Sequence, residues 1–196
     1  MIGRIVLPAL AGLLTLGLAV AVVLGARWCA GDAGDTAIAG ERLTTFPVLD
    51  RAALDPTQAA IATAAEREFA APGPGTKYAD GIAEPWCADF VSWVMRAAGV
   101  PYANPNSGSW RIPGVYTLKE YYEAEGRFAP IAEAPPPKAG DVLLYHKKSA
   151  FGEHVNLVLA ARDGVVTTIG GNEFGEIRIH RFALAEVRNV LGVGLL

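Results

Sequence analysis

The stretch that decides the fold is PWCADFVSWVMRAAGV, residues 85–100. Its apolar residues recur at helical spacing, and Gly99 is typical of the residue that follows the end of a helix. We therefore predict an amphipathic helix over about residues 86–98, with Cys87 in its first turn. The stripe expected to be buried consists of Phe90, Val94 and Ala97.

Helices are predicted before strands along the chain. Asp55-Pro56 is typical of a helix start, an N-cap followed by proline, and helical spacing continues to Pro72. A short helix is expected from the capping box at Thr117 to about Gly126. Short apolar or alternating runs then predict strands over residues 141–146, 155–161, 165–169, 176–182 and 190–195. This order indicates an α+β domain in which N-terminal helices pack on an antiparallel β-sheet.

Composition and charge limit the class of protein. The 196 residues are 52% apolar, which favours one packed domain after any targeting segment. The net charge of −3 and the absence of a Lys/Arg cluster exclude nucleic acid as the main partner. Only Cys29 and Cys87 occur, so no disulfide framework explains the fold.

Residues 5–26 are almost wholly apolar and lie between Arg4 and Arg27. At about 1.5 Å per residue, a helix of about 22 residues reaches about 33 Å, enough to cross a bilayer. We predict an uncleaved membrane anchor; a cleaved secretory signal is the alternative. Cys29 is interpreted as incidental, because the residues before it lack the small-residue box of lipid attachment.

Three parts follow from this reading. Residues 1–26 form the transmembrane anchor or signal segment, residues 27–54 an extracytoplasmic linker, and residues 55–196 the folded domain. The expected location is the cell membrane, single-pass with the domain outside, or alternatively the exterior after signal cleavage.

Cys87 is the candidate nucleophile. The unpaired N–H groups and the dipole at a helix start stabilise a thiolate, which is the reactive form of cysteine. The same N–H groups can contribute to an oxyanion hole. The alternative is a buried cysteine that acts only as a small hydrophobic residue.

His154 is the candidate base, because it directly precedes the apolar run 155–159 and its ring can be aimed rigidly. His146 and His180 are expected at the surface. If the next two strands pair through a turn at Asp163-Gly164, Asn172 comes close to His154 and is the candidate that orients the imidazole.

Four segments in order, PWCADFVSWVMRAAGVP, PPPKAGDVLLYH, EHVNLVLA and VVTTIGGNE, resemble the CHAP family. These are cysteine- and histidine-dependent amidohydrolases and peptidases of the papain-like superfamily that cut peptidoglycan. The resemblance covers about residues 56–196 and implies a papain-like fold. It also implies that Cys87 is the nucleophile, His154 the base and Asn172 the polar orienting group.

The chain departs from the family pattern at several positions. Many members carry an acid where this chain has Gly170, so the orienting carboxylate is missing or replaced, with Glu173 as the candidate. Many also carry a glycine where this chain has Asn156. Gln58, the only glutamine, lies too early for an oxyanion hole and is expected on a helix surface. The calcium-binding acidic cluster of some phage relatives has no match around Tyr78, so we expect no metal and no cofactor.

A cleft around Cys87 is expected to bind substrate. Its candidate residues are Trp86, Tyr78, Trp110 and Glu173, with Tyr145 as a further aromatic. The alternative for each ring is a partly buried structural role.

These features predict a cell-envelope cysteine hydrolase that cleaves a peptidoglycan amide, either between sugar and peptide or within a peptide cross-bridge. The alternative is a weak or inactive CHAP-like domain that binds the cell wall or a secretion or conjugation partner, which the missing acid at Gly170 favours. A transpeptidase acting through the same residues is a third option. The expected partners are peptidoglycan and the membrane; the oligomeric state stays open.

Overall fold

The computed structural model describes residues 37–196. The predicted anchor or signal segment, residues 1–26, and Cys29 lie outside these residues. Within them, no helix combines the length and the apolar character needed to cross a membrane.

Among the described residues, four α-helices precede most of the strands, which is the predicted order, although only three of the four were predicted. They are α2 (Pro56–Ala70), α3 (Gly75–Tyr78), α4 (Cys87–Ala97) and α5 (Val115–Ala124), with 3-10 turns η1 (Arg51–Ala53) and η2 (Leu184–Glu186). The strands are β1 (Glu41–Leu43), β2 (Phe128–Pro130), β3 (Val142–Tyr145), β4 (His154–Arg162), β5 (Val165–Glu173), β6 (Glu176–Ala183) and β7 (Val190–Gly194).

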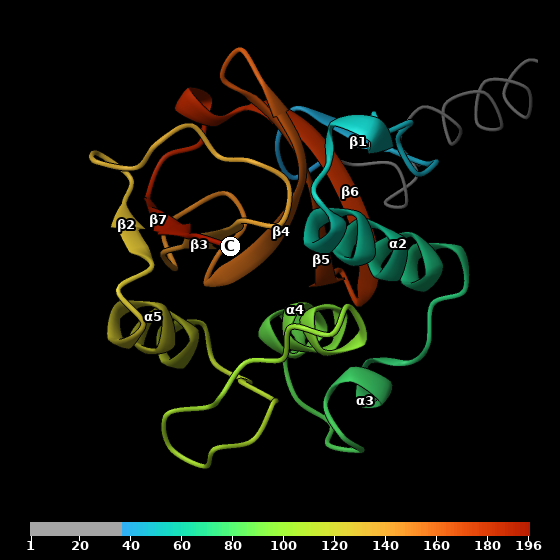
Figure 1. Cartoon of the computed structure of the whole chain (residues 1–196), viewed down its shortest axis with the longest axis vertical. Coiled ribbons are helices and arrows are strands. Elements are labelled where there is room, and N and C mark those ends of the chain that lie inside the picture. The colour runs from blue at the N-terminus through green and yellow to red at the C-terminus, as the bar shows by residue number, and fades with distance from the viewer. Residues whose placement is uncertain (1–36) are drawn as a thin grey trace, which may run out of the picture. The chain divides into compact units, whose positions relative to one another are not determined.

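The strands form one antiparallel sheet in the order β1-β6-β5-β4-β3-β7-β2. The five strands predicted from the sequence are its central members and β7. Figure 1 shows α2 next to β6 and α5 next to β2. The α+β architecture is confirmed, and it is compatible with a papain-like domain.

The N-terminal cap of α2 is the one that the sequence predicts, whereas the predicted cap of α5 is not formed. Asp55 caps α2: its carboxylate accepts from the backbone N–H of Gln58, and the Gln58 side chain accepts from the N–H of Asp55. Gln58 is buried and also donates to a backbone carbonyl, so the expected surface position is wrong. Helix α5 begins at Val115 without a side-chain cap from the described part of the chain, so Thr117 does not form the predicted capping box.

The folded unit begins earlier than predicted. Residues 37–196 form one compact unit, and β1 pairs with β6 through Leu43 and Ile179. The predicted linker, residues 27–54, therefore overlaps the domain from Ala37 onward. A three-residue strand is too short to show a period of two, although its pairing covers an edge that β6 would otherwise leave open.

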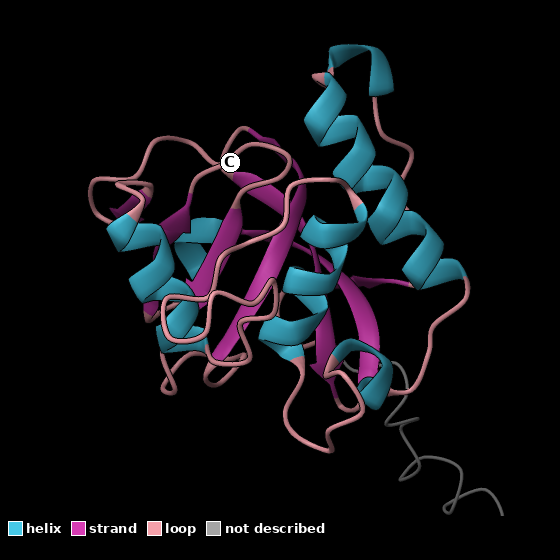
Figure 2. Ribbon diagram, turned by 60° about the horizontal axis from the view of Figure 1, so that its bottom comes forward, coloured by secondary structure: helices cyan, strands magenta, loops and turns pink. Residues whose placement is uncertain are grey.

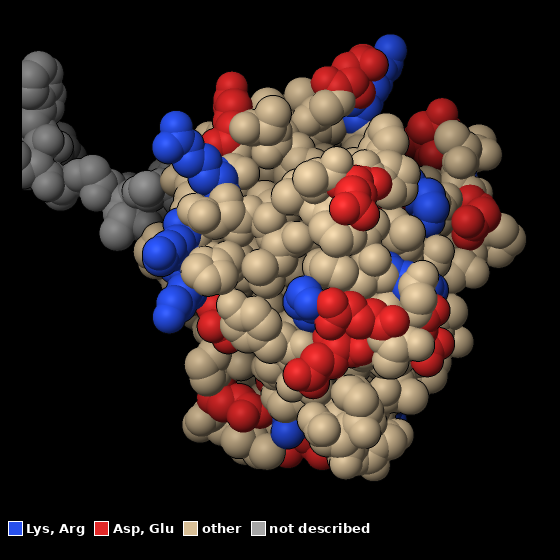
Figure 3. Space-filling model, turned by 90° about the vertical axis from the view of Figure 1, so that its left-hand side faces the viewer, with Lys and Arg blue, Asp and Glu red and all other residues tan. Residues whose placement is uncertain are grey.

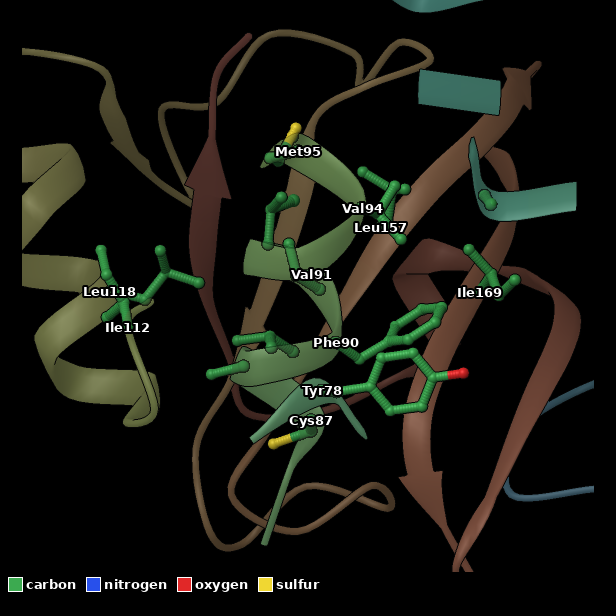
Figure 4. Close-up of a cluster of buried hydrophobic side chains, with 14 of the residues drawn as sticks. Tyr78, Cys87, Phe90, Val91, Val94, Met95, Ile112, Leu118, Leu157 and Ile169 are labelled. Atoms are coloured by element: carbon green, nitrogen blue, oxygen red, sulfur yellow. The ribbon is translucent and has the colours of Figure 1, made fainter. Parts of the chain in front are cut away.

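One hydrophobic core lies between the helices and the sheet. Helices α2 and α4 lie side by side over the strands, and α4 contacts β4 and β5 (Figure 2). Figure 4 shows Phe90, Val91 and Val94 of α4 in this core, with Leu157 and Ile169 from the sheet. A second apolar cluster covers the other face of the sheet: Leu143, Tyr145, Val158, Val166, Phe182, Val190 and Val193.

Figure 3 shows one face of the domain, on which acidic and basic side chains both lie among uncharged ones.

Candidate active site

Cys87 is the first residue of α4, as predicted. The buried stripe of the helix fixes its axis against the sheet, and Cys87 lies at the end of the helix beyond this stripe (Figure 4). No side chain of the described part caps α4, so the N–H groups of its first turn stay available. Cys87 keeps 6% of its surface exposed. A thiolate and a developing oxyanion both benefit from this position.

His154 is the first residue of β4 and pairs with Tyr145 of β3. Its ring is nearly parallel to that of Phe151, with centroids 5.8 Å apart and an interplanar angle of 9°. The side chain is buried and lies next to both Cys87 and Glu173. His154 is thus held between the start of α4 and the end of β5.

The carboxylate of Glu173, not the amide of Asn172, contacts the imidazole. Nε2 of His154 lies 3.2 Å from Oε1 of Glu173, and Glu173 is only 2% exposed. Asn172 instead lines a pocket beside Trp86. The orienting role of Asn172 stays a prediction, and Glu173, expected to touch substrate, is the residue whose carboxylate lies beside the imidazole.

A β-bulge in β5 explains why Glu173, and not Asn172, contacts His154. Gly170 pairs with Arg178 and Glu173 with Glu176, so β5 contains one extra residue between the two pairs. Asn172 has φ of 61°, in the left-handed region. Regular alternation from Gly170 would place Asn172 on the side of His154. The extra residue reverses this alternation, and Glu173 takes that side.

Gly170 leaves the room that Glu173 occupies. A Cβ atom at Gly170 would lie 2.3 Å from the side-chain amide of Asn156, 2.3 Å from Oε1 of Glu173 and 2.9 Å from Nε2 of His154. The two departures from the family pattern, Gly170 and Asn156, are therefore in contact and compensate each other. The carboxylate reaches the imidazole from position 173, and position 170 must be empty for it to do so.

Asn156 supports the carboxylate from β4. The amide orientation that satisfies both of its ends directs the nitrogen to Nε2 of His154, at 2.8 Å, to the backbone carbonyl of Val155, at 2.9 Å, and to Oε1 of Glu173, at 3.1 Å. The oxygen then accepts from Oγ1 of Thr168, at 3.2 Å. Because Asn156 is fully buried, these contacts fix Glu173 within the interior.

The electrostatics favour a charged imidazole. Burial lowers the pKa of His154, but hydrogen bonding and charge from Cys87 and Glu173 outweigh burial and raise that pKa from 6.5 to about 9. Burial raises the pKa of Glu173, but His154 and His180 outweigh it and hold that pKa below its usual value. The site thus stabilises an imidazolium next to a carboxylate at neutral pH.

The other two histidines differ from one another. His146 is half-buried and its Nδ1 accepts from the N–H of Lys148. His180 is fully buried, with Nδ1 3.0 Å from Oε2 of Glu173, so its expected surface position is wrong. The alternation of β6 was read correctly, but the face opposite Ile179 is also covered.

The predicted cleft aromatics have different positions. Trp86 borders the pocket beside Asn172 but is itself buried. Tyr78 is fully buried, stacks on Trp86 at 5.1 Å and donates its hydroxyl hydrogen to Glu68. Both are parts of the core. Trp110 packs on Trp93 and Arg96, in the last turns of α4, and so lies away from Cys87 at the helix start.

Tyr145, the further aromatic, is also fully buried, on the face of the second apolar cluster. Its ring centroid lies 6.4 Å from that of His154. It therefore forms part of the wall behind the imidazole.

An ion-pair network ties the loops around α4 to its first turn. Arg111 donates to Asp89 at 2.8 Å and also pairs with Glu84. Asp89 is fully buried; burial raises its pKa to about 6, although Arg111 opposes this. Glu84 borders the same pocket as Trp86, so the network fixes one wall of that pocket.

Fold and site together define a class: an α+β domain whose central helix begins with a cysteine beside a strand histidine. The family model of the CHAP domain matches residues 77–172, and this match supports the assignment of the chain to the CHAP domain family. CHAP domains are generally cysteine- and histidine-dependent amidohydrolases. No curated protein and no solved structure shows significant similarity to the chain.

The matched segment ends at Asn172, one residue before Glu173. Sequence reasoning named Glu173 as a replacement carboxylate but did not find His180. The adjacent glycines Gly170 and Gly171 are the signal that was available, since glycine within a strand often marks a bulge or a close approach.

Proposed function

We propose that this chain is a cell-envelope cysteine hydrolase that cleaves an amide bond in bacterial peptidoglycan. The observation that carries the proposal is the line of three groups, Cys87 at a helix start, the buried His154 ring and the carboxylate of Glu173. The match to the CHAP domain family supports the substrate class. In this proposal Glu173 takes the orienting role for which Asn172 was predicted.

The reaction begins at Cys87. Its thiolate attacks the carbonyl carbon of the amide, and the backbone N–H groups at the start of α4 stabilise the resulting oxyanion. The imidazolium of His154 then donates its proton to the leaving nitrogen. The C–N bond breaks, and an acyl-enzyme and a free amine remain.

Water completes the cycle. Neutral His154 removes a proton from water, which attacks the acyl-enzyme; the C–S bond then breaks, the carboxylic acid leaves, and the thiolate of Cys87 and the imidazolium of His154 are restored. Because Oε1 of Glu173 faces Nε2, the carboxylate fixes the ring and stabilises each imidazolium state. A raised His154 pKa of about 9 suits the proton-donating step at neutral pH.

The binding-only alternative loses its main support. It rested on the absence of an acid at Gly170, and the structure has a buried carboxylate 3.2 Å from Nε2 of His154. A transpeptidase differs only in the amine that resolves the acyl-enzyme, and no observed feature favours it.

We further propose that the domain acts outside the membrane, tethered by residues 5–26 or released after their cleavage. The support is the apolar character of that segment. The proposed substrate lies in the same compartment.

The test uses the purified full-length chain with isolated peptidoglycan, and mass analysis of the released muropeptides. Wild type is expected to create new amine and carboxyl ends, and the masses identify the bond. Cys87→Ala is expected to abolish them. Cys29→Ala is the matched control, since it removes the other thiol and keeps Cys87. Wild-type activity in Cys87→Ala would refute the proposal.

A further inference from the structure

Glu173 is shared by two buried histidines. Its Oε1 lies 3.2 Å from Nε2 of His154, and its Oε2 lies 3.0 Å from Nδ1 of His180. The second contact is close but is not aligned as a straight hydrogen bond. His180 belongs to β6 and is fully buried. The carboxylate is therefore held between the imidazole beside Cys87 and a second imidazole that the reaction does not use.

A backbone contact fixes the tautomer of His180. The N–H of Ile38 donates to its Nε2, at 3.3 Å. Nε2 must then present its lone pair, so the ring proton sits on Nδ1 and faces Glu173. Ile38 belongs to the segment that leads into β1, outside the segment matched by the CHAP model. A part of the chain before the matched domain thus bears on the active site.

His180 lies close to Oε2 of Glu173, within a buried environment of aromatic and charged side chains. Phe151 lies edge-on to His180, with centroids 5.6 Å apart. Tyr145 of β3 is buried nearby, and the charge of Glu173 contributes to raising its pKa, after burial. Arg178, also on β6, stacks on Phe174 and pairs with the exposed Glu176.

The remaining neighbours of Glu173 and His154 come from three elements. His154 and Asn156 extend from β4, Thr168 from β5, and Cys87 from α4. Only His154 and Cys87 among these are titratable.

We infer that His180 is a positioning residue for the hydrolysis, acting through Glu173 on His154, and that the segment at Ile38 sets its tautomer. The kinetic consequence of this inference rests on the proposed function, whereas the contacts of His180 with Glu173 and Ile38 do not depend on it. Without the second imidazole, Oε2 of the buried carboxylate loses the ring nitrogen that lies 3.0 Å away, and the carboxylate turns from His154 or takes up a proton.

The experiment compares His180→Leu with His180→Asn in the full-length protein. The Asn side chain places an amide N–H near the position of Nδ1, whereas Leu offers no donor. An NMR titration of the His154 ring is the first readout and needs no substrate. Kinetics on peptidoglycan is the second.

In His180→Leu we expect the His154 midpoint to fall from about 9 by at least one pH unit, which corresponds to about tenfold weaker proton binding. We expect kcat to fall about tenfold with KM unchanged, and His180→Asn to restore both values. An unshifted midpoint in folded His180→Leu would overturn the inference. Equal loss in the Leu and Asn variants would do so too.

A second pair of variants, at Ile38, tests the inference if His180→Leu does not fold. Ile38→Pro removes the N–H donor, and Ile38→Ala keeps it while shortening the same side chain. A lowered His154 midpoint in the Pro variant alone supports the inference, and wild-type midpoints in both overturn it. If the midpoints shift but no variant, nor wild type, cleaves peptidoglycan, the proposed function fails and the positioning role stands.

Discussion

Gly170→Ala is the substitution that tests the arrangement of the site most directly. The φ of Gly170 is not positive, so the backbone at this position accepts alanine. Only the contacts of the new methyl group oppose the substitution. The new Cβ would lie 2.3 Å from the side-chain amide of Asn156, 2.3 Å from Oε1 of Glu173 and 2.9 Å from Nε2 of His154. Ordinary contacts are about 3.5 Å, so the amide and the carboxylate must both retreat by roughly 1 Å.

Two magnitudes follow from this displacement. Overpacking of a buried position lowers the free energy of unfolding by about 1–3 kcal/mol. For a domain of this size, a loss of about 2 kcal/mol corresponds to a fall in Tm of roughly 4–8 °C. A displacement of about 1 Å in a catalytic constellation lowers the rate about 100-fold. We therefore expect Gly170→Ala to fold, with reduced stability and about 1% of wild-type kcat.

The assay is a double-mutant cycle with Asn156→Gly, followed by urea unfolding and by peptidoglycan cleavage. Asn156→Gly removes the amide, one of the two polar groups that the new Cβ meets at 2.3 Å, and opens room for Glu173. The double variant should be more stable than the sum of the single losses by about 1 kcal/mol or more.

Gly171→Ala is the matched control, because its Cβ would meet Phe90 and Trp86 and not the polar cluster. Adding Asn156→Gly to Gly171→Ala should not reduce the loss of stability that Gly171→Ala causes. Wild-type stability and activity in Gly170→Ala, or additive losses in the cycle, would refute the reasoning.

Three further predictions concern charge and packing. Burial lowers the pKa of His154, but Cys87 and the carboxylate of Glu173 outweigh burial and raise that pKa from 6.5 to about 9. The stabilisation that the protonated His154 adds to the free energy of unfolding is therefore fully present below pH 6.5 and is lost as pH rises through about 9. Urea unfolding at pH 6 and pH 10 checks this, and a fall no larger than that of His154→Gln would contradict it. Arg111→Met should lower stability at pH 7 by about 3–5 kcal/mol, because it leaves Asp89 buried without its cation; part of the loss should return below pH 6 as Asp89 takes up a proton, and a loss under about 1 kcal/mol at pH 7 would count against the network. Trp110→Ala should leave kcat/KM on peptidoglycan unchanged and reduce only Tm, since the ring packs on α4 away from Cys87; a rise in KM would return Trp110 to the substrate cleft.

Local signals in the sequence were sufficient for most of the fold. The N-cap at Asp55, the helix that begins with Cys87 and the turn at Asp163-Gly164 are where the sequence predicts them. Each depends on interactions among near neighbours: a cap, a helical stripe, or two residues with positive φ in a hairpin turn. Strand β1 is different, because three residues have no periodicity and exist as a strand only through β6.

Covered and uncovered faces cannot be told apart from one strand alone. His180 alternates with Ile179 as a solvent-facing residue would, yet a second apolar cluster, with Phe182 of the same strand, buries its face as well. The expected surface position failed because burial depends on what the rest of the chain packs against that face.

For the site, the sequence by itself determined where the candidate nucleophile and the candidate base lie. Cys87 follows from the start of an amphipathic helix and His154 from the start of a core strand, and both lie within the segment that the CHAP domain model matches. Only the tertiary structure decided which carboxylate contacts the imidazole. Strand alternation has a period of two, so one extra residue exchanges the sides of Asn172 and Glu173. That bulge depends on pairing with β6 and on the space left at Gly170, and both arise only when distant segments meet.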